Sequence, residues 1–185
     1  LTGIVGGRPT VYPVIRLFSF LADKGACAME VELNGERTPV ALPQIAVLDS
    51  AQIAADIAAP QPSGQADACV PLIKLAVARS GDKGNHSNIG VMARKPDYLA
   101  WIAAALTEGA VAEWMQHALD PQTGKVSRWY LPGSHSLNFL LENALGGGGV
   151  ASLRIDPQGK AFAQQLLEFP IPVPKALAAS LEQGQ

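Results

Sequence analysis

The strongest constraint on this fold is an alternation of apolar runs and amphipathic segments that begins at residue 72 and continues to residue 169. Residues 72–78, LIKLAVA, form a nearly continuous apolar run, which is typical of a central strand covered on both faces. Residues 89–93, IGVMA, predict a second strand. The twelve residues from Arg79 to Gly90 lie across the junction of these runs and predict a polar loop.

The rest of this region continues the alternation of strands and helices. Lys95-Pro96-Asp97 is typical of a helix start, because Pro is tolerated in the first turn and Asp complements the helix dipole there. Thr107 is placed to cap the next helix, and Ser134 and Asp156 are placed to cap two later ones. The expected elements are a helix through residue 106, a helix at 108–119, a strand at 125–131, a helix at 135–145, a strand at 150–155 and a helix at 158–169. We therefore expect an α/β (α+β) sandwich with about four strands and helices packed on them.

The upstream region has a different pattern. Asn34-Gly35 between the extended runs 26–33 and 36–42 is the strongest hairpin signal in the chain and predicts a type I′ turn. Residues 14–21 are β-branched and aromatic and favour a strand or a short buried segment. Asp49 or Ser50 is placed to cap a short helix at 51–58. Pro, Gly and Ser then concentrate around residues 60–67, which is typical of a linker.

These patterns predict four regions. Residues 1–58 are expected to be the end of a larger N-terminal domain, 59–70 a linker, 71–170 the α/β domain and 171–185 a tail that frays or packs on a partner. The start at Leu-Thr-Gly predicts a piece of a longer protein.

Composition narrows the classes of partner. The chain has 185 residues, 48% of them hydrophobic and 16% charged, with a formal net charge of -2. This charge balance does not predict binding to nucleic acid. No basic run or long apolar stretch predicts binding to a membrane. We expect a cytoplasmic protein with reduced thiols, although a single disulfide between Cys27 and Cys69 stays open. The separated histidines and the lack of paired CxxC motifs predict no metal site.

The segment from residue 79 to residue 90, RSGDKGNHSNIG, is the main candidate for chemistry. Its glycines allow backbone N–H groups to converge and its cations attract an anion, which favours a phosphate or carboxylate site. The residues that would bind the ligand are Arg79, Ser80, Gly81, Lys83, Gly84 and Asn85, with Asn88 orienting the substrate. Asp82 and His86 are the candidate acid and base. An equally weighted alternative is a polar hairpin loop in which Asp82 and Asn85 bond their own backbone.

Two further segments are candidates for the same site. Four consecutive glycines at 146–149 exceed what a helix C-cap needs, and Gly146, Gly147 and Gly148 are the expected ligand contacts. The simpler interpretation is still a C-cap followed by a tight strand entry. Asn138 is expected to face either the core or a ligand, and Ser134 beside His135 is better explained as an N-cap than as a nucleophile.

The chain resembles a known family. The segments LAVARSGDKGNHSNIGVMAR and YLPGSHSLNFLLENALGGGGVASLRIDPQGKAFAQQLLEF closely resemble the C-terminal domain of the acyclic terpene utilisation AtuA family. The upstream GGRPTVYPVIRLFSFLADK resembles the end of that family's large N-terminal domain. The resemblance implies a ferredoxin-like domain, and the expected element order, with two strands before the first helix, implies a circularly shifted or elaborated version of it.

Two functional hypotheses follow. In the first, the resemblance implies a part in acyclic terpenoid or branched acyl-CoA catabolism, with residues 79–85 binding an anionic ligand such as a coenzyme A thioester; the cofactor is otherwise unknown. In the second, the chain is a non-catalytic module that docks on the rest of its own protein, the expected N-terminal domain, or forms a homo-oligomer. A site would be favoured if the two glycine-rich segments meet in space.

Overall fold

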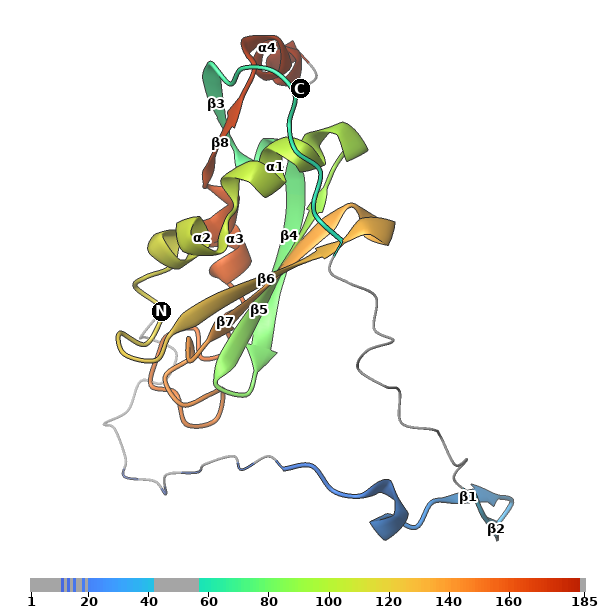
Figure 1. Cartoon of the computed structure of the whole chain (residues 1–185). Coiled ribbons are helices and arrows are strands. Elements are labelled where there is room, and N and C mark those ends of the chain that lie inside the picture. The colour runs from blue at the N-terminus through green and yellow to red at the C-terminus, as the bar shows by residue number, and fades with distance from the viewer. Residues whose placement is uncertain are drawn as a thin grey trace. The chain divides into compact units, whose positions relative to one another are not determined.

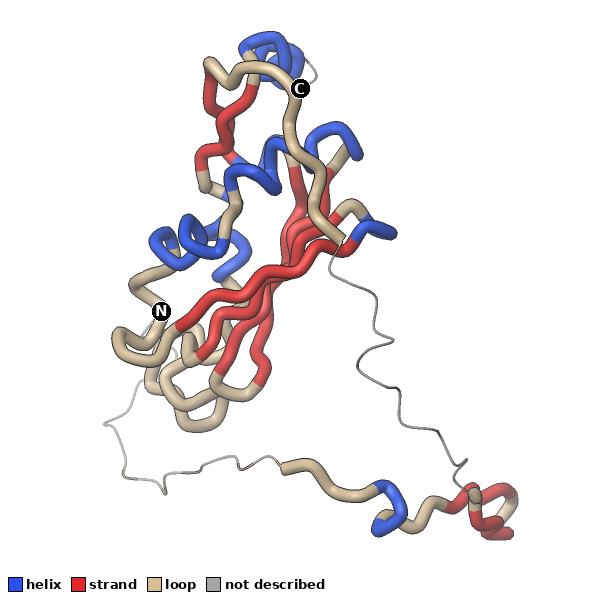
Figure 2. The backbone as a smooth tube through the Cα atoms, viewed as in Figure 1, coloured by secondary structure: helices blue, strands red, loops and turns tan. Residues whose placement is uncertain are grey.

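The computed structural model describes residues 11, 13, 15, 18, 20–41 and 57–183. The chain divides into two compact units, one within Phe18–Asp56 and one that includes Ile57–Gln185 (Figures 1 and 2). The expected strand at 14–21 and helix at 51–58 fall mostly outside the described residues.

The unit within Phe18–Asp56 contains the predicted hairpin. A short 3-10 helix, η1 (Lys24–Ala26), precedes the antiparallel strands β1 (Glu30–Leu33) and β2 (Glu36–Pro39). Asn34 and Gly35 both have positive φ, 54° and 86°, as a type I′ turn requires. The prediction of a hairpin at Asn34-Gly35 is therefore confirmed.

The larger unit is built on a four-stranded antiparallel sheet. Its strands are β4 (Ala76–Lys83), β5 (His86–Ala93), β6 (Lys125–Leu131) and β7 (Ser136–Glu142). Their order in the sheet is β4-β5-β7-β6. The helices α1 (Leu99–Ala105), α2 (Glu108–Trp114) and α3 (Phe162–Leu167) pack on one face of it (Figures 1 and 2). The predicted α/β fold with a four-stranded sheet is confirmed.

The connectivity is that of a circularly shifted ferredoxin-like fold. The chain leaves β5, crosses through α1 and α2, and returns as β6, while β7 lies between these two parallel strands. This split βαβ unit is the defining element of the βαββαβ fold. Here the strand that would come last, β4, stands first in the chain. The expectation of a circular shift is therefore correct.

A second, smaller sheet joins the two ends of this arrangement. Strand β3 (Ala68–Pro71), just before β4, pairs antiparallel with β8 (Pro170–Val173), which follows α3. The final helix, α4 (Lys175–Gln183), begins beside this pair, where Asp67 accepts a hydrogen bond from the Lys175 backbone N–H at 2.7 Å. The short 3-10 helices are η3 (Leu72–Lys74), η4 (Pro96–Tyr98) and η5 (Pro132–Ser134).

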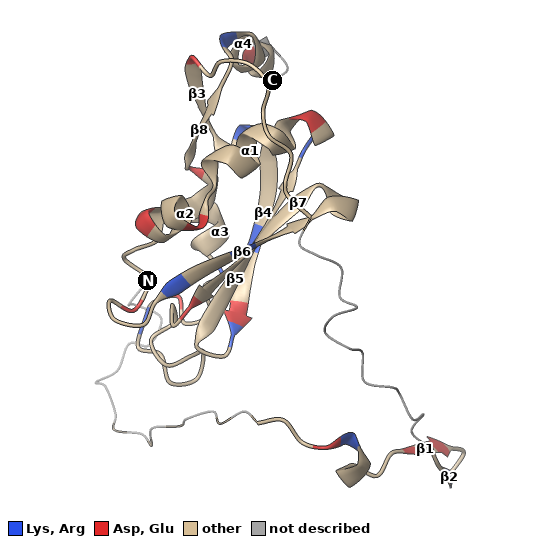
Figure 3. Ribbon diagram, viewed as in Figure 1, with Lys and Arg blue, Asp and Glu red and all other residues tan. Residues whose placement is uncertain are grey.

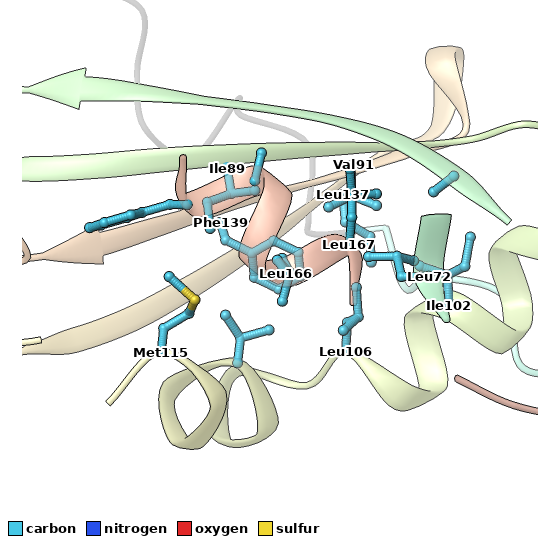
Figure 4. Close-up of a cluster of buried hydrophobic side chains, with 14 of the residues drawn as sticks. Leu72, Ile89, Val91, Ile102, Leu106, Met115, Leu137, Phe139, Leu166 and Leu167 are labelled. Atoms are coloured by element: carbon cyan, nitrogen blue, oxygen red, sulfur yellow. The ribbon is translucent and has the colours of Figure 1, made fainter. Parts of the chain in front are cut away.

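The core lies between the sheet and its helices. Ile89, Val91, Leu137 and Phe139 alternate along the two central strands and point toward the helices (Figure 4). They meet side chains from η3, α1, α2 and α3 and from the connections between the helices, including Leu72, Ile102, Leu106, Met115, Leu166 and Leu167. This burial is the main source of stability for the domain.

The secondary structure of three segments in the larger unit differs from the prediction. Residues 136–142 form β7 and not a helix, because Leu137, Phe139 and Leu141 are buried on alternate positions, and this period of two prevails over the helical spacing of the leucines. Residues 150–155 form turns and loop and no strand. The run at 72–78 begins as η3 and then enters β4, which is an edge strand and not a central one.

The predicted helix starts agree with the structure in part. The Thr107 side chain accepts a hydrogen bond from the Ala110 N–H at 3.1 Å, so it caps α2, although the helix ends at Trp114 and not near residue 119. The Asp156 carboxylate accepts from the N–H groups of Lys160 and Ala161 at 2.9 and 2.8 Å, and α3 starts later than expected, at Phe162. The Thr107 cap is therefore confirmed. The caps predicted at Asp156 and Ser134 are wrong, because the N-cap of α3 is Ala161 and β7 follows Ser134.

Charged residues are sparse and scattered over the described elements (Figure 3). Within the part of the chain that the structure describes, no helix is long and apolar enough to cross a membrane. Cys27 and Cys69 are both exposed free thiols.

Candidate functional site

The polar segment from Arg79 to Gly90 is a tight hairpin and not the predicted loop. Residues 79–83 complete β4, residues 86–90 begin β5, and only Gly84 and Asn85 form the turn. Gly84 has a φ of 65°, as the first central position of a two-residue hairpin turn demands. The polar side chains are distributed over two faces of the sheet, because alternate residues of a strand point to opposite sides.

On the helix face, the hairpin is tied to α3. The buried Ser80 hydroxyl donates to the Lys160 carbonyl at 3.1 Å and accepts from the Ala163 N–H at 2.9 Å. The Ser87 hydroxyl, on the same face, donates to the Gly81 carbonyl at 3.1 Å. Ser80 therefore has its hydrogen-bonding capacity used inside the fold.

The two candidate proton-transfer residues are placed on different faces. Asp82 pairs in register with Ser87 on the helix face, and its carboxylate lies 3.6 Å from the Lys160 ammonium. His86 pairs with Lys83 on the other face, and its Nδ1 accepts the Asn143 N–H at 2.9 Å. This bond places the ring proton of neutral His86 on Nε2. The hairpin does not bring Asp82 and His86 together as an acid and base pair.

The two glycine-rich segments meet at the hairpin turn. The Gly147 N–H donates to the Asn85 side-chain oxygen at 2.7 Å, and the Asn85 carbonyl accepts from the N–H groups of Ala144 and Leu145. A Cβ on Gly148 would lie 2.9 Å from the Gly84 carbonyl oxygen. Gly146, Gly147 and Gly148 have φ values of 64°, 109° and 90°, so this close approach needs glycine. The Asn85 side chain thus joins the loops to each other.

The face of the sheet opposite the helices presents the remaining predicted residues. Cross-strand register aligns Arg79, Gly90, Asn138 and Trp129 in one row over all four strands, here called the polar row. The Asn88 amide, from the neighbouring row, donates to the Asn138 side-chain oxygen at 3.2 Å. A Cβ on Gly90 would meet only the Arg79 carbonyl oxygen, at 3.9 Å. The polar row therefore presents the Arg79 cation, the Asn138 amide and the Trp129 indole, and Gly90 leaves open space between Arg79 and Asn138.

An apolar row lies next to the polar row on the same face. Register aligns Val77, Met92, Ser136 and Leu131. The Val77, Met92 and Leu131 side chains remain 39%, 47% and 46% exposed, and Trp129 in the polar row is 44% exposed. No described helix or strand covers this open face (Figures 1 and 2).

The other predicted cations are exposed. The Lys83 ammonium donates to the Asp82 carbonyl at 2.9 Å and stands at the hairpin turn. Within the described residues, Arg79 makes none of the ion pairs, and no group of three His, Cys, Asp or Glu side chains is positioned to hold a metal.

Sequence reasoning missed three residues of this region. Trp129 lies in the strand predicted at 125–131, and its parity is opposite to that of buried Val126, which indicates an outward side chain. Asn143 joins Asn85 to the 120–124 turn, and its φ is 51°. It was missed because a helix was predicted at 135–145, where the structure has the end of β7. Lys160 reaches Asp82 only through the tertiary fold.

The fold and this open face define a small α/β domain of circularly shifted ferredoxin-like topology, with helices on one face of its sheet. Residues 70–172 match the family of the AtuA ferredoxin-like domain, and the match begins in β3 and ends in β8. Because the match covers more than half of the chain, the chain belongs to this family, as the sequence resemblance predicted. Neither the curated proteins nor the solved structures include a significant match to the chain.

Proposed function

We propose that this chain is part of a protein of acyclic terpenoid or branched acyl-CoA catabolism, and that its domain binds an anionic acyl ligand on the open face of the sheet. Membership of the AtuA ferredoxin-like domain family supports the first part. The single observation that supports the second part is the polar row, in which exposed Arg79 stands beside side-chain-free Gly90 and the Asn138 amide.

The chemistry of the two rows fits an amphipathic anion. The Arg79 guanidinium offers a planar fork of donors that suits a carboxylate or phosphate oxygen pair. Gly90 leaves space for the ligand against the backbone, and the hydrogen-bonded amides of Asn88 and Asn138 border that space. The adjoining apolar row of Val77, Met92 and Leu131 suits a branched acyl chain. Strands are spaced about 4.8 Å apart, so the polar row spans roughly 15 Å from Arg79 to Trp129, which is long enough to hold a small acyl compound.

The glycine turns have a supporting role in this proposal. The Asn85 side chain is hydrogen-bonded to Asn143 and to the Gly147 N–H, and its backbone carbonyl accepts from the N–H groups of residues 144 and 145. These bonds hold the turn in place between β4 and β5. Lys83 is exposed at this end of the open face and supplies positive charge for a longer anion, such as a coenzyme A thioester, and exposed Gly84 leaves the backbone beside it accessible.

Titration calorimetry tests the proposal with isovalerate and isovaleryl-coenzyme A as probes. Arg79→Ala should weaken binding of both by about tenfold to a hundredfold, because a charge-assisted hydrogen bond is lost. Asn138→Ala should weaken it less. Lys24→Ala, which removes an exposed cation from the other unit, is the control and should leave both affinities unchanged. Equal affinities for wild type and Arg79→Ala would refute an anion site on the polar row.

A docking or oligomerisation module is the second candidate. The observation in its favour is the exposure of Val77, Met92, Trp129 and Leu131 on one face, since contiguous exposed apolar side chains mark interaction surfaces. Light scattering with size-exclusion chromatography tests self-association. A dimer that Trp129→Lys converts to a monomer supports this candidate, and a monomeric wild type at millimolar concentration contradicts self-association.

A further inference from the structure

A basic pocket lies at the end of the sheet away from the glycine turns. It has a volume of about 480 Å³ and is lined by Ile73, Lys74, Arg94, Lys95, Tyr98, Ser180 and Leu181. These residues come from η3, the end of β5, η4 and α4, so elements far apart in the sequence enclose one space. A volume of this size suits a small organic ligand.

All the charged side chains that line the pocket are positive. Three of its seven lining residues are cations, and none is a carboxylate. In the described part of the chain, none of the four ion pairs involves Lys74, Arg94 or Lys95. The neighbouring carboxylates Asp97 and Glu182 are exposed and are not part of the lining. Three cations that line one pocket without a counter-charge give it a positive potential, which favours an anion.

Two of the three cations make contacts within the fold. The Arg94 Nε–H donates to the Ile73 carbonyl at 3.1 Å, which fixes the guanidinium and leaves its two terminal NH2 groups for a ligand. The Lys95 ammonium stands 5.6 Å from the centre of the Tyr98 ring, and the ring itself is buried. The Ser180 hydroxyl donates to the Leu177 carbonyl at 2.7 Å, so within the described residues the side-chain donors that remain in the lining are the three cations and the Tyr98 hydroxyl.

We propose that this basic pocket binds an organic phosphate that carries at least two negative charges, a site distinct from the polar row and beyond the function proposed above. A single carboxylate would neutralise only one of the three cations, whereas a diphosphate or a nucleotide matches their number. The fork of Arg94 and the point charges of Lys74 and Lys95 are the combination that phosphate oxygens favour. Ile73 and Leu181 give the pocket an apolar wall for the organic part of the ligand.

Titration calorimetry with ADP, inorganic pyrophosphate and isovalerate tests this assignment on the full chain. The double variant Lys74→Ala, Lys95→Ala should weaken ADP and pyrophosphate binding by about a hundredfold and leave isovalerate binding unchanged. Arg79→Ala should weaken isovalerate binding and leave ADP and pyrophosphate binding unchanged. The proposal for the basic pocket and the proposal for the polar row can therefore be refuted separately. Lys125→Ala, which removes an exposed lysine on β6, is the control for loss of a surface lysine outside the pocket.

Two further measurements separate a loss of binding from a loss of folding and test the role of Arg94. Thermal unfolding of each variant confirms that it is folded, and Arg94→Lys, which keeps the charge but loses the fork, should weaken ADP binding by about tenfold. ADP binding that does not change in the double variant would overturn the proposal. So would the absence of ADP and pyrophosphate binding to the wild type at millimolar concentration.

Discussion

The Asn85 side-chain amide donates to the Asn143 side-chain oxygen at 3.1 Å and joins the β4–β5 turn to the end of β7. The Asn143 amide in turn donates to the Thr123 carbonyl and hydroxyl oxygens, and Asn85 also accepts the Gly147 N–H. Three loops far apart in the sequence are thus held by one hydrogen-bonded network. Such a network is costly to break, because each remaining partner is left unsatisfied.

Replacement of Asn85 by Ala should lower the free energy of unfolding by about 1–3 kcal/mol, because the Asn143 oxygen and the Gly147 N–H both lose their partner. Urea denaturation followed by circular dichroism measures this loss. Asn88→Ala removes a single side-chain hydrogen bond on the open face and is the matched control, with a smaller expected loss. Equal losses for the two variants would contradict a special role for Asn85.

The contact between Gly148 and Gly84 predicts a steric effect. Gly148→Ala places a Cβ 2.9 Å from the Gly84 carbonyl oxygen at a φ of 90°. We expect a loss of about 3 kcal/mol of unfolding free energy from overpacking and backbone strain.

Gly109 in α2 is the control glycine, because a Cβ there meets nothing within 4 Å. Gly109→Ala should stabilise the fold by about 0.5 kcal/mol, since alanine restricts the unfolded chain and favours helix. Chemical denaturation of both variants checks the opposite signs. A Gly148→Ala variant as stable as the wild type would show that the two glycine segments do not meet.

Asp120 predicts a pH dependence of stability. Hydrogen bonds from the Thr123 hydroxyl, the Thr123 N–H and the Gln122 N–H hold the pKa of this carboxyl below its usual value. Its contribution to stability is therefore complete above the usual pKa and is lost as the pH falls through the lowered pKa.

The wild type should therefore exceed Asp120→Asn in Tm at neutral pH, and the difference should shrink as the pH falls to about 2. Calorimetric melting over this pH range measures the effect. A difference in Tm that is constant with pH would exclude the carboxylate charge as its cause.

Arg128 connects β6 to the end of α1. Its guanidinium donates to the carbonyls of Ala103 and Leu106 at 2.7 and 2.8 Å, where a cation also complements the helix dipole. Arg128→Met, which keeps the apolar stem, should cost about 2 kcal/mol of unfolding free energy. Arg128→Lys should recover part of this loss through one hydrogen bond. If Met and Lys gave the same stability by urea denaturation, the charged hydrogen bonds would not be the cause.

Much of the fold was predictable where the signals are local. The Asn34-Gly35 turn, the Thr107 cap and the strand at 125–131 depend on residues a few positions apart, and all three were predicted correctly. The β7 segment was not, because its leucines satisfy both a helical and an extended spacing. Pairing with β5 and β6, which are distant in the sequence, decides between the two.

The family, the alternation of strands and helices, and the concentration of polar groups between residues 79 and 90 follow from the sequence alone. The contacts that these polar groups make depend on the tertiary structure. The fold places Ser80 and Asp82 on the helix face and brings the Asn85 side chain into hydrogen bonds with the neighbouring loops. It also aligns Arg79 with Asn138 and Trp129 on the open face. The reason is that the register of β5 against β7, which joins Gly90 to distant Asn138, is set by packing over the whole sheet and not by a local pattern.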